Sequence, residues 1–137
     1  MTALLPLFVC TCQGAAEAVW VREPSVVGKG YWEGDIVAGK KEGLWQLVMP
    51  GKGVVEETTY RAGKREGYTI SWHGPGKLYY IGRMKGDKGN GPFIQWYMDG
   101  RLKHVGQFLD GMPAGLWKAY TYDSADHPRI TTWTHER

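Results

Sequence analysis

The stretch that decides the fold runs from Gly39 to Asp123, where one short phrase is written four times. The four versions are GKKEGLW at 39–45, GKREGYT at 63–69, GDKGNGPF at 86–93 and GMPAGLW at 111–117. The second glycine of each version falls at position 43, 67, 91 or 115, and these positions are 24 residues apart. A fixed period of this length indicates stacked units, each too small to bury its own apolar face.

Other positions keep the same register. The positions two residues after the glycine hold Trp45, Thr69, Phe93 and Trp117. The positions five residues after it hold Val48, Trp72, Trp96 and Tyr120. A further phase holds Gly34, Thr58, Gly82 and Gly106. The second copy is therefore the weakest match, because threonines stand where the other copies have a glycine and a large aromatic residue.

The composition of the repeats favours strands over helices. Glycine at this density would cost about 1 kcal/mol per site in a helix interior. The segments between glycines, such as 68–72 and 93–97, are short and rich in aromatic and β-branched residues, and turn residues such as Asp99-Gly100 separate them. The sequence therefore predicts an all-β fold, an elongated single-layer antiparallel sheet of stacked β-hairpin repeats with capping strands.

With these features the chain resembles a known family, the MORN repeat (membrane occupation and recognition nexus), whose hallmark is a glycine- and aromatic-rich hairpin of about this length. The resemblance covers roughly residues 28–123. The Gly-x-Trp-x-x-Tyr form of the last copy is most similar to the bacterial branch often labelled as antitoxin components. The phrases that carry it are Tyr31-Trp32-Glu33-Gly34, Gly43-Leu44-Trp45, Tyr80-Ile81-Gly82, Gly91-Pro92-Phe93, Gly106-Gln107-Phe108 and Gly115-Leu116-Trp117-Lys118-Ala119-Tyr120. The resemblance implies this fold, but it implies little about function, because such repeats serve unrelated proteins as scaffolds.

The chain divides into four segments. Residues 1–18 are predicted to be a secretory signal peptide, since an apolar run is followed by small-residue endings. No lysine or arginine precedes that run, so the alternative is a buried N-terminal strand or helix. Residues 19–38 form a capping strand and half a repeat, residues 39–123 hold the four repeats, and residues 124–137 form a C-terminal capping strand.

Both cysteines, Cys10 and Cys12, lie in or beside the apolar run. Cleavage would leave a mature domain without a disulfide. Lipidation of Cys12 is an alternative, whereas a Cys-x-Cys metal site lacks a second ligand pair at zinc-like spacing. The sequence predicts no cofactor and no metal.

Charge and residue types argue against two classes of function. The net charge is +3, and the basic residues are dispersed at turns, whereas nucleic-acid binders gather them on one stripe. The histidines and serines lack nucleophile or ligand motifs, and Glu56 and Glu57 are adjacent, so on a strand they point to opposite faces. We expect neither a nucleic-acid partner nor an enzyme.

Two aromatic ladders are the candidate binding residues. One consists of Trp72, Trp96 and Tyr120, the other of Trp32, Tyr80 and His104. They serve either as core or as an open surface that contacts a ligand. The first hypothesis is an exported scaffold that binds a partner protein, with a toxin or effector implied by the antitoxin-labelled branch. A membrane-associated module and a glycan-binding sheet are the alternatives, and the oligomeric state is left open.

Overall fold

A computed structural model describes residues 14–26 and 28–136 of the chain. These residues form one sheet of ten antiparallel strands, and the strands lie side by side in chain order. The strands are β1 (Ala18–Pro24), β2 (Tyr31–Val37), β3 (Lys40–Met49), β4 (Gly53–Arg61), β5 (Lys64–Gly74), β6 (Lys77–Lys85), β7 (Lys88–Trp96), β8 (Leu102–Leu109), β9 (Met112–Tyr122) and β10 (Pro128–His135). The predicted all-β, single-layer antiparallel fold is confirmed.

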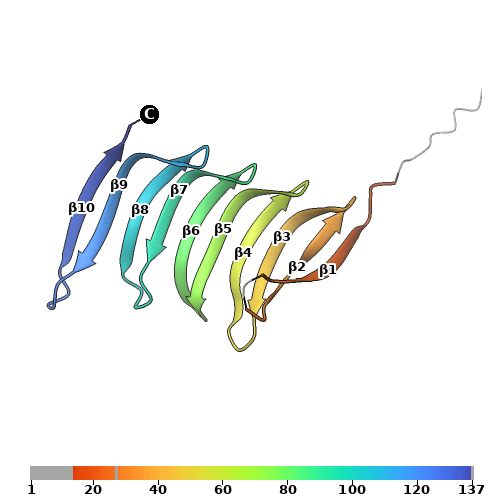
Figure 1. The fold of residues 1–137 in the computed structure, drawn as a ribbon, viewed down its shortest axis with the longest axis horizontal. Helices are drawn as coiled ribbons and strands as arrows, with labels where there is room; N and C mark the ends of the chain where they lie inside the picture. Colours follow the sequence, from red (N-terminus) through yellow and green to blue (C-terminus); the bar gives the residue numbers. More distant parts are fainter. Residues whose placement is uncertain (1–13, 27, 137) are drawn as a thin grey trace, which may run out of the picture.

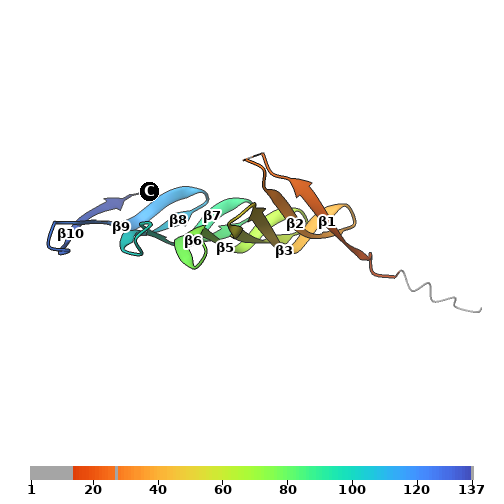
Figure 2. The ribbon, with the colours of Figure 1, turned by 90° about the horizontal axis from the view of Figure 1, so that it is seen from below.

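The sheet is long and thin. Figure 1 shows the strands running from β1 at one end to β10 at the other, and Figure 2 shows the same sheet edge-on as a single twisted layer. Within the described residues, no second layer covers either face. The buried apolar side chains of the described residues are accordingly few, namely Trp45, Ala114 and Trp117.

The first glycine of each copy lies in a two-residue hairpin loop. The loops are Ala38-Gly39, Ala62-Gly63, Gly86-Asp87 and Asp110-Gly111. Both residues of every loop have positive φ, as a type I′ turn requires. This explains the wider spacing in the third copy, because there glycine takes the first loop position and Asp87 the second, with φ 71°.

The second glycine of each copy lies in a β-bulge. Opposite Gly34, for example, strand β3 runs through Gly43, Leu44 and Trp45 before the pairing resumes. The same irregularity recurs in the pairings β4–β5, β6–β7 and β8–β9. Bulges increase the local twist of a sheet and redirect side chains. The period of 24 residues is therefore the length of one hairpin with its bulge.

The longer connections lie at the opposite ends of the strands from the two-residue hairpin loops. Asp99-Gly100 belongs to a five-residue loop, 97–101, in which the Tyr97 amide donates to the Arg101 carbonyl over 2.8 Å. Loop 123–127 repeats that bond, with the Asp123 amide donating to the His127 carbonyl. Arg101 forms ion pairs with Asp99 and with Asp126, so it ties the two loops together.

Both ends of the sheet agree with the predicted capping strands. Strand β1 pairs with β2 along its whole length, and β10 pairs with β9 from Pro128↔Tyr122 to His135↔Gly115. The predicted signal segment falls largely on residues 1–13, which lie outside the described residues. Ala18 opens β1, opposite Val37. Cleavage after Ala18 would therefore remove the first residue of β1.

Candidate functional site

Three aromatic rings lie against glycines of the preceding strand. A Cβ atom added to Gly34 would lie 2.6 Å from Cδ2 of Trp45, and one added to Gly82 would lie 3.4 Å from Phe93. Trp117 covers Gly106 still more closely. The indole N–H groups of Trp45 and Trp117 donate to the carbonyls of Asp35 and Gln107. Each copy except the second thus contains one glycine–ring pair.

These rings continue into a stack along one side of the sheet. The Phe93 ring centroid lies 5.8 Å from that of Tyr80 and 5.4 Å from that of Phe108. Trp117 follows at 5.2 Å from Phe108, and Trp133 of β10 lies 6.3 Å from Trp117. We call this side the ring face; among its aromatic residues are Trp45, Tyr60, Tyr80, Phe93, Phe108, Trp117 and Trp133.

The second copy replaces the glycine–ring pair with two threonines. Thr58 and Thr69 are Cα partners, and their Oγ1 atoms lie 2.5 Å apart in a hydrogen bond. Their exposed fractions are 1% and 5%. The hydroxyl groups satisfy each other, and the described residues contain no buried side-chain N or O atom without a partner. The copy that matches the repeat least well therefore has a buried hydrogen bond in place of the glycine–ring pair.

Thr69→Val is expected to cost about 1–3 kcal/mol of unfolding free energy, because it leaves the buried Thr58 hydroxyl without a partner. Valine keeps the shape of threonine, so the loss arises from the hydrogen bond. The double change Thr58→Val with Thr69→Val removes both hydroxyls and should recover most of the loss. Urea unfolding of the two single variants and the double variant measures the coupling. Additive losses would mean that the hydroxyls do not depend on each other.

A hollow of ≈ 300 Å³ opens on the ring face beside this threonine pair. Its small residues are Thr69, Gly82, Gly89 and Gly111, and its larger ones are Tyr80, Phe93, Phe108, Met84, Arg65 and Arg83. We call it the ring-face hollow. Gly89 keeps it open, since a Cβ there would already lie 3.2 Å from Phe108. Small residues and aromatic rings make up most of the lining, and two arginines complete it.

Charged residues lie on the same face, next to the rings. Burial raises the pKa of the Glu56 carboxyl, and the Arg65 guanidinium and a hydrogen bond from Tyr80 offset part of that rise. Burial, followed by the charge of Glu56, raises the pKa of Tyr80 to about 12. The Nε atom of Arg65 lies 3.3 Å from Oδ1 of Asp87 in an ion pair. The Tyr80 hydroxyl stays protonated at neutral pH and serves as a hydrogen-bond donor there.

The predicted ladder of Trp32, Tyr80 and His104 lies on the ring face. Gln95 is the Cα partner of both Tyr80 and His104. Following the paired residues from strand to strand in the other direction leads from Tyr80 to Trp32, so the three predicted residues share one row across the sheet. Tyr80 belongs to the ring stack, and His104 lies edge-on to Trp133 with centroids 6.5 Å apart. Burial, and then Lys103, lowers the pKa of His104.

The predicted ladder of Trp72, Trp96 and Tyr120 lies on the opposite side of the sheet. Each follows directly a residue of the row just described, and successive side chains of a strand alternate between faces. We call this side the second face. All six predicted residues are half-buried. The two ladders therefore belong to different surfaces, and a single partner surface cannot contact both.

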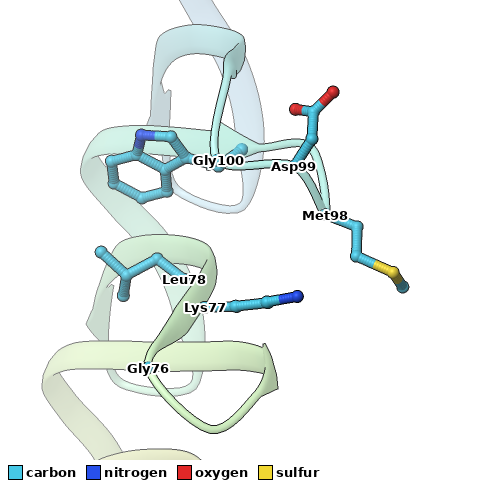
Figure 3. A pocket seen from close by; sticks show the side chains of 7 residues that line it. Gly76, Lys77, Leu78, Met98, Asp99 and Gly100 are labelled. Atoms are coloured by element: carbon cyan, nitrogen blue, oxygen red, sulfur yellow. The ribbon is translucent and has the colours of Figure 1, made fainter.

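The second face has a hollow of its own, of ≈ 330 Å³, between loop 97–101 and the start of β6. Figure 3 shows the Leu78 side chain pointing to one side of the ribbon and those of Lys77 and Met98 to the other. Trp96 also lines this hollow. Its lining is more polar than that of the ring-face hollow.

Sequence reasoning did not select Phe93, Phe108, Trp117 or Trp133 as site residues. The signal for the first three was present, since each occupies a periodic position, and a glycine stands opposite the rings of Phe93 and Trp117. Trp133 lies outside the repeats, and only the pairing of β10 with β9 places it against Trp117.

No protein-family model matches the chain, and a search of curated proteins finds no match either. The described part of the chain holds no group of three or more His, Cys, Asp or Glu residues that could bind a metal ion. It also has no helix long and apolar enough to cross a membrane.

Proposed function

We propose that this chain is a non-enzymatic MORN-repeat scaffold that binds a partner protein through its ring face. The antitoxin-labelled branch that the repeats resemble makes a toxin or effector the first candidate for that partner. Export, as predicted from residues 1–18, would place the encounter in the cell envelope or outside the cell.

The observation that carries the proposal is the uncovered ring stack. Rings from Tyr80 to Trp133 follow one another at centroid distances of 5.2–6.3 Å on a single-layer sheet. Within the described residues no second layer of the chain packs over them; Trp117 is 7% exposed, and Trp133 at the end of the stack is 36% exposed. Contiguous apolar patches on a protein surface mark interaction sites, and buried aromatic residues contribute strongly to binding at such interfaces.

A photoreactive phenylalanine analogue at position 133 tests the proposal in cells that express the protein natively. We expect one discrete protein adduct on irradiation, because this side chain lies at the open end of the ring stack. The matched control carries the same analogue at position 116. Leu116 is 53% exposed and lies in the bulge of the neighbouring strand β9, opposite Thr134, but it lies on the second face, where it lines a hollow with Lys118 and Tyr120.

Position 116 should give no such adduct. A protein adduct from position 116 alone would move the interface to the second face and contradict the proposal. An adduct of lipid or glycan mass from position 133, without protein, would favour the membrane-associated or glycan-binding alternative.

A further inference from the structure

One row of paired residues crosses the sheet beneath the rings. Successive Cα partners run from Trp45 through Thr58, Thr69 and Gly82 to Phe93, and then to Gly106. Trp45 and Phe93 lie four strands apart, about 19 Å at 4.8 Å per strand, whereas Phe93 and Trp117 lie two strands apart, about 10 Å. The row therefore lacks one ring, and the missing ring belongs to the second copy.

The contacts of the next copy show where that ring would lie. Phe93 contacts Tyr80, Phe108 and Trp117. A shift of one period converts these three positions to Glu56, Met84 and Phe93. Met84 and Phe93 both line the ring-face hollow, and Thr69 lies at its base. The hollow is therefore the space that an aromatic residue at position 69 would fill.

The chemistry of the hollow matches an aromatic ring. Phe93 and Phe108 lie at its sides in an edge-to-face arrangement, with an interplanar angle of 89°, and edge-to-face and offset contacts are the geometries that aromatic rings prefer. The thioether of Met84 adds a favourable contact with a ring. Its size also suffices, since an apolar cavity of about 150 Å³ accepts benzene in another protein.

We propose that the ring-face hollow receives an aromatic side chain of the partner protein, which takes the place of the ring that the second repeat lacks. This inference rests on the proposed function and adds the residue type that the partner presents. The ring of the next copy is the template: Phe93 lies against Gly82, Phe108 and Trp117, as the incoming ring would lie beside Thr69 and against Met84 and Phe93.

The first test uses N-acetyl-L-tryptophanamide as a probe and ¹⁵N-labelled protein observed by NMR. The amide signals of Thr69, Gly82 and Gly89 should shift saturably, with a dissociation constant on the order of 1 mM, as expected for a ligand of this size. N-acetyl-L-leucinamide is the matched non-aromatic probe and should bind at least about tenfold more weakly. Equal responses to the two probes, or shifts confined to Leu78 and Trp96 on the second face, would overturn the inference.

The second test fills the hollow from within. The double change Thr58→Gly with Thr69→Trp restores the glycine–ring pair of the other copies, so the new indole should occupy the hollow and weaken the tryptophan probe at least about tenfold. Thr58→Gly alone leaves the hollow open and is the control, with the probe affinity expected to stay within about twofold. If the double variant fails to fold, Met84→Glu places a charge in the hollow and should abolish the shifts.

The cross-link from position 133 separates this inference from the proposed function. Loss of the protein adduct in the folded Thr58→Gly/Thr69→Trp variant supports both. An unchanged adduct in that variant would overturn the inference and leave the proposed function standing. If the protein that carries only the analogue at position 133 gives no protein adduct, the inference and the proposed function are both overturned, whatever result the tryptophan probe gives.

Discussion

Replacing Gly106 by alanine is expected to lower the free energy of unfolding by about 3 kcal/mol, in the upper range for overpacking. The added Cβ would lie closer than 3.0 Å to three atoms of the Trp117 ring. That ring is 7% exposed and has neighbours on several sides, with Phe93 and Phe108 against one part and Trp133 against another. These neighbours limit how far the ring can move, so part of the strain stays in the sheet. Urea unfolding followed by circular dichroism measures the loss.

Gly82→Ala is the matched control, because Gly82 has the same position in its own copy. The new Cβ would lie 3.4 Å from Phe93, an ordinary van der Waals contact. Alanine is also favoured over glycine in a strand interior by up to about 1 kcal/mol, so the variant should be close to neutral. Equal losses at the two positions would show that the ring above glycine is not the cause.

Trp45→Ala is expected to cost about 3–5 kcal/mol, which is the range for truncating a buried tryptophan. Trp45 is 0% exposed, its N–H donates to the Asp35 carbonyl over 3.1 Å, and the Lys41 ammonium lies 4.0 Å from its ring centroid. The total free energy of unfolding of a domain is only about 5–15 kcal/mol, so this one change removes a large share of the stability. Because each strand pairs only with its neighbours, hydrogen exchange should accelerate most in β2, β3 and β4.

Trp20→Ala provides the comparison for the same chemical change at an exposed position. Trp20 lies on β1 and is 57% exposed, with the Arg22 guanidinium 5.4 Å from its ring centroid. Its loss should cost under about 1 kcal/mol. If the two tryptophan truncations had similar effects, or if exchange rose uniformly along the sheet, Trp45 would not be a local centre of packing.

The fold could be predicted because the repeat encodes it twice, in its period and in its turn residues. Glycines 24 residues apart give the length of one repeat, and glycine readily adopts the positive φ found in the tight loops and bulges, as at Gly39 and Gly43. The length of each loop was harder to predict. Asp99-Gly100 is the strongest two-residue signal in the chain, yet it lies in a five-residue loop, because Arg101 and Asp99 organise that loop through their own hydrogen bonds.

The candidate site was less accessible to prediction. Periodicity places Trp96 and Tyr80 in regular ladders, but bulges decide which positions face the same side, and bulges are not visible as such in a list of residues. The hollow was less visible still. It depends on two substitutions, Thr58 and Thr69, that read as a weak copy of the repeat, together with Gly89, where two other copies carry Lys41 and Arg65. An absent side chain gives no positive signal in a sequence.

The strict order of the strands also bears on how the protein is made. Each strand from β2 to β9 bonds to the strand before it and the strand after it in the chain, and β1 and β10 each bond to their one neighbour, so no described strand waits for a distant partner. Long-range pairing is what makes most β proteins slow to fold and prone to aggregate. Each hairpin of this chain needs only the edge of the hairpin before it, so we expect the sheet to grow strand by strand from its N-terminal end, whether the chain emerges from a ribosome or from an export channel.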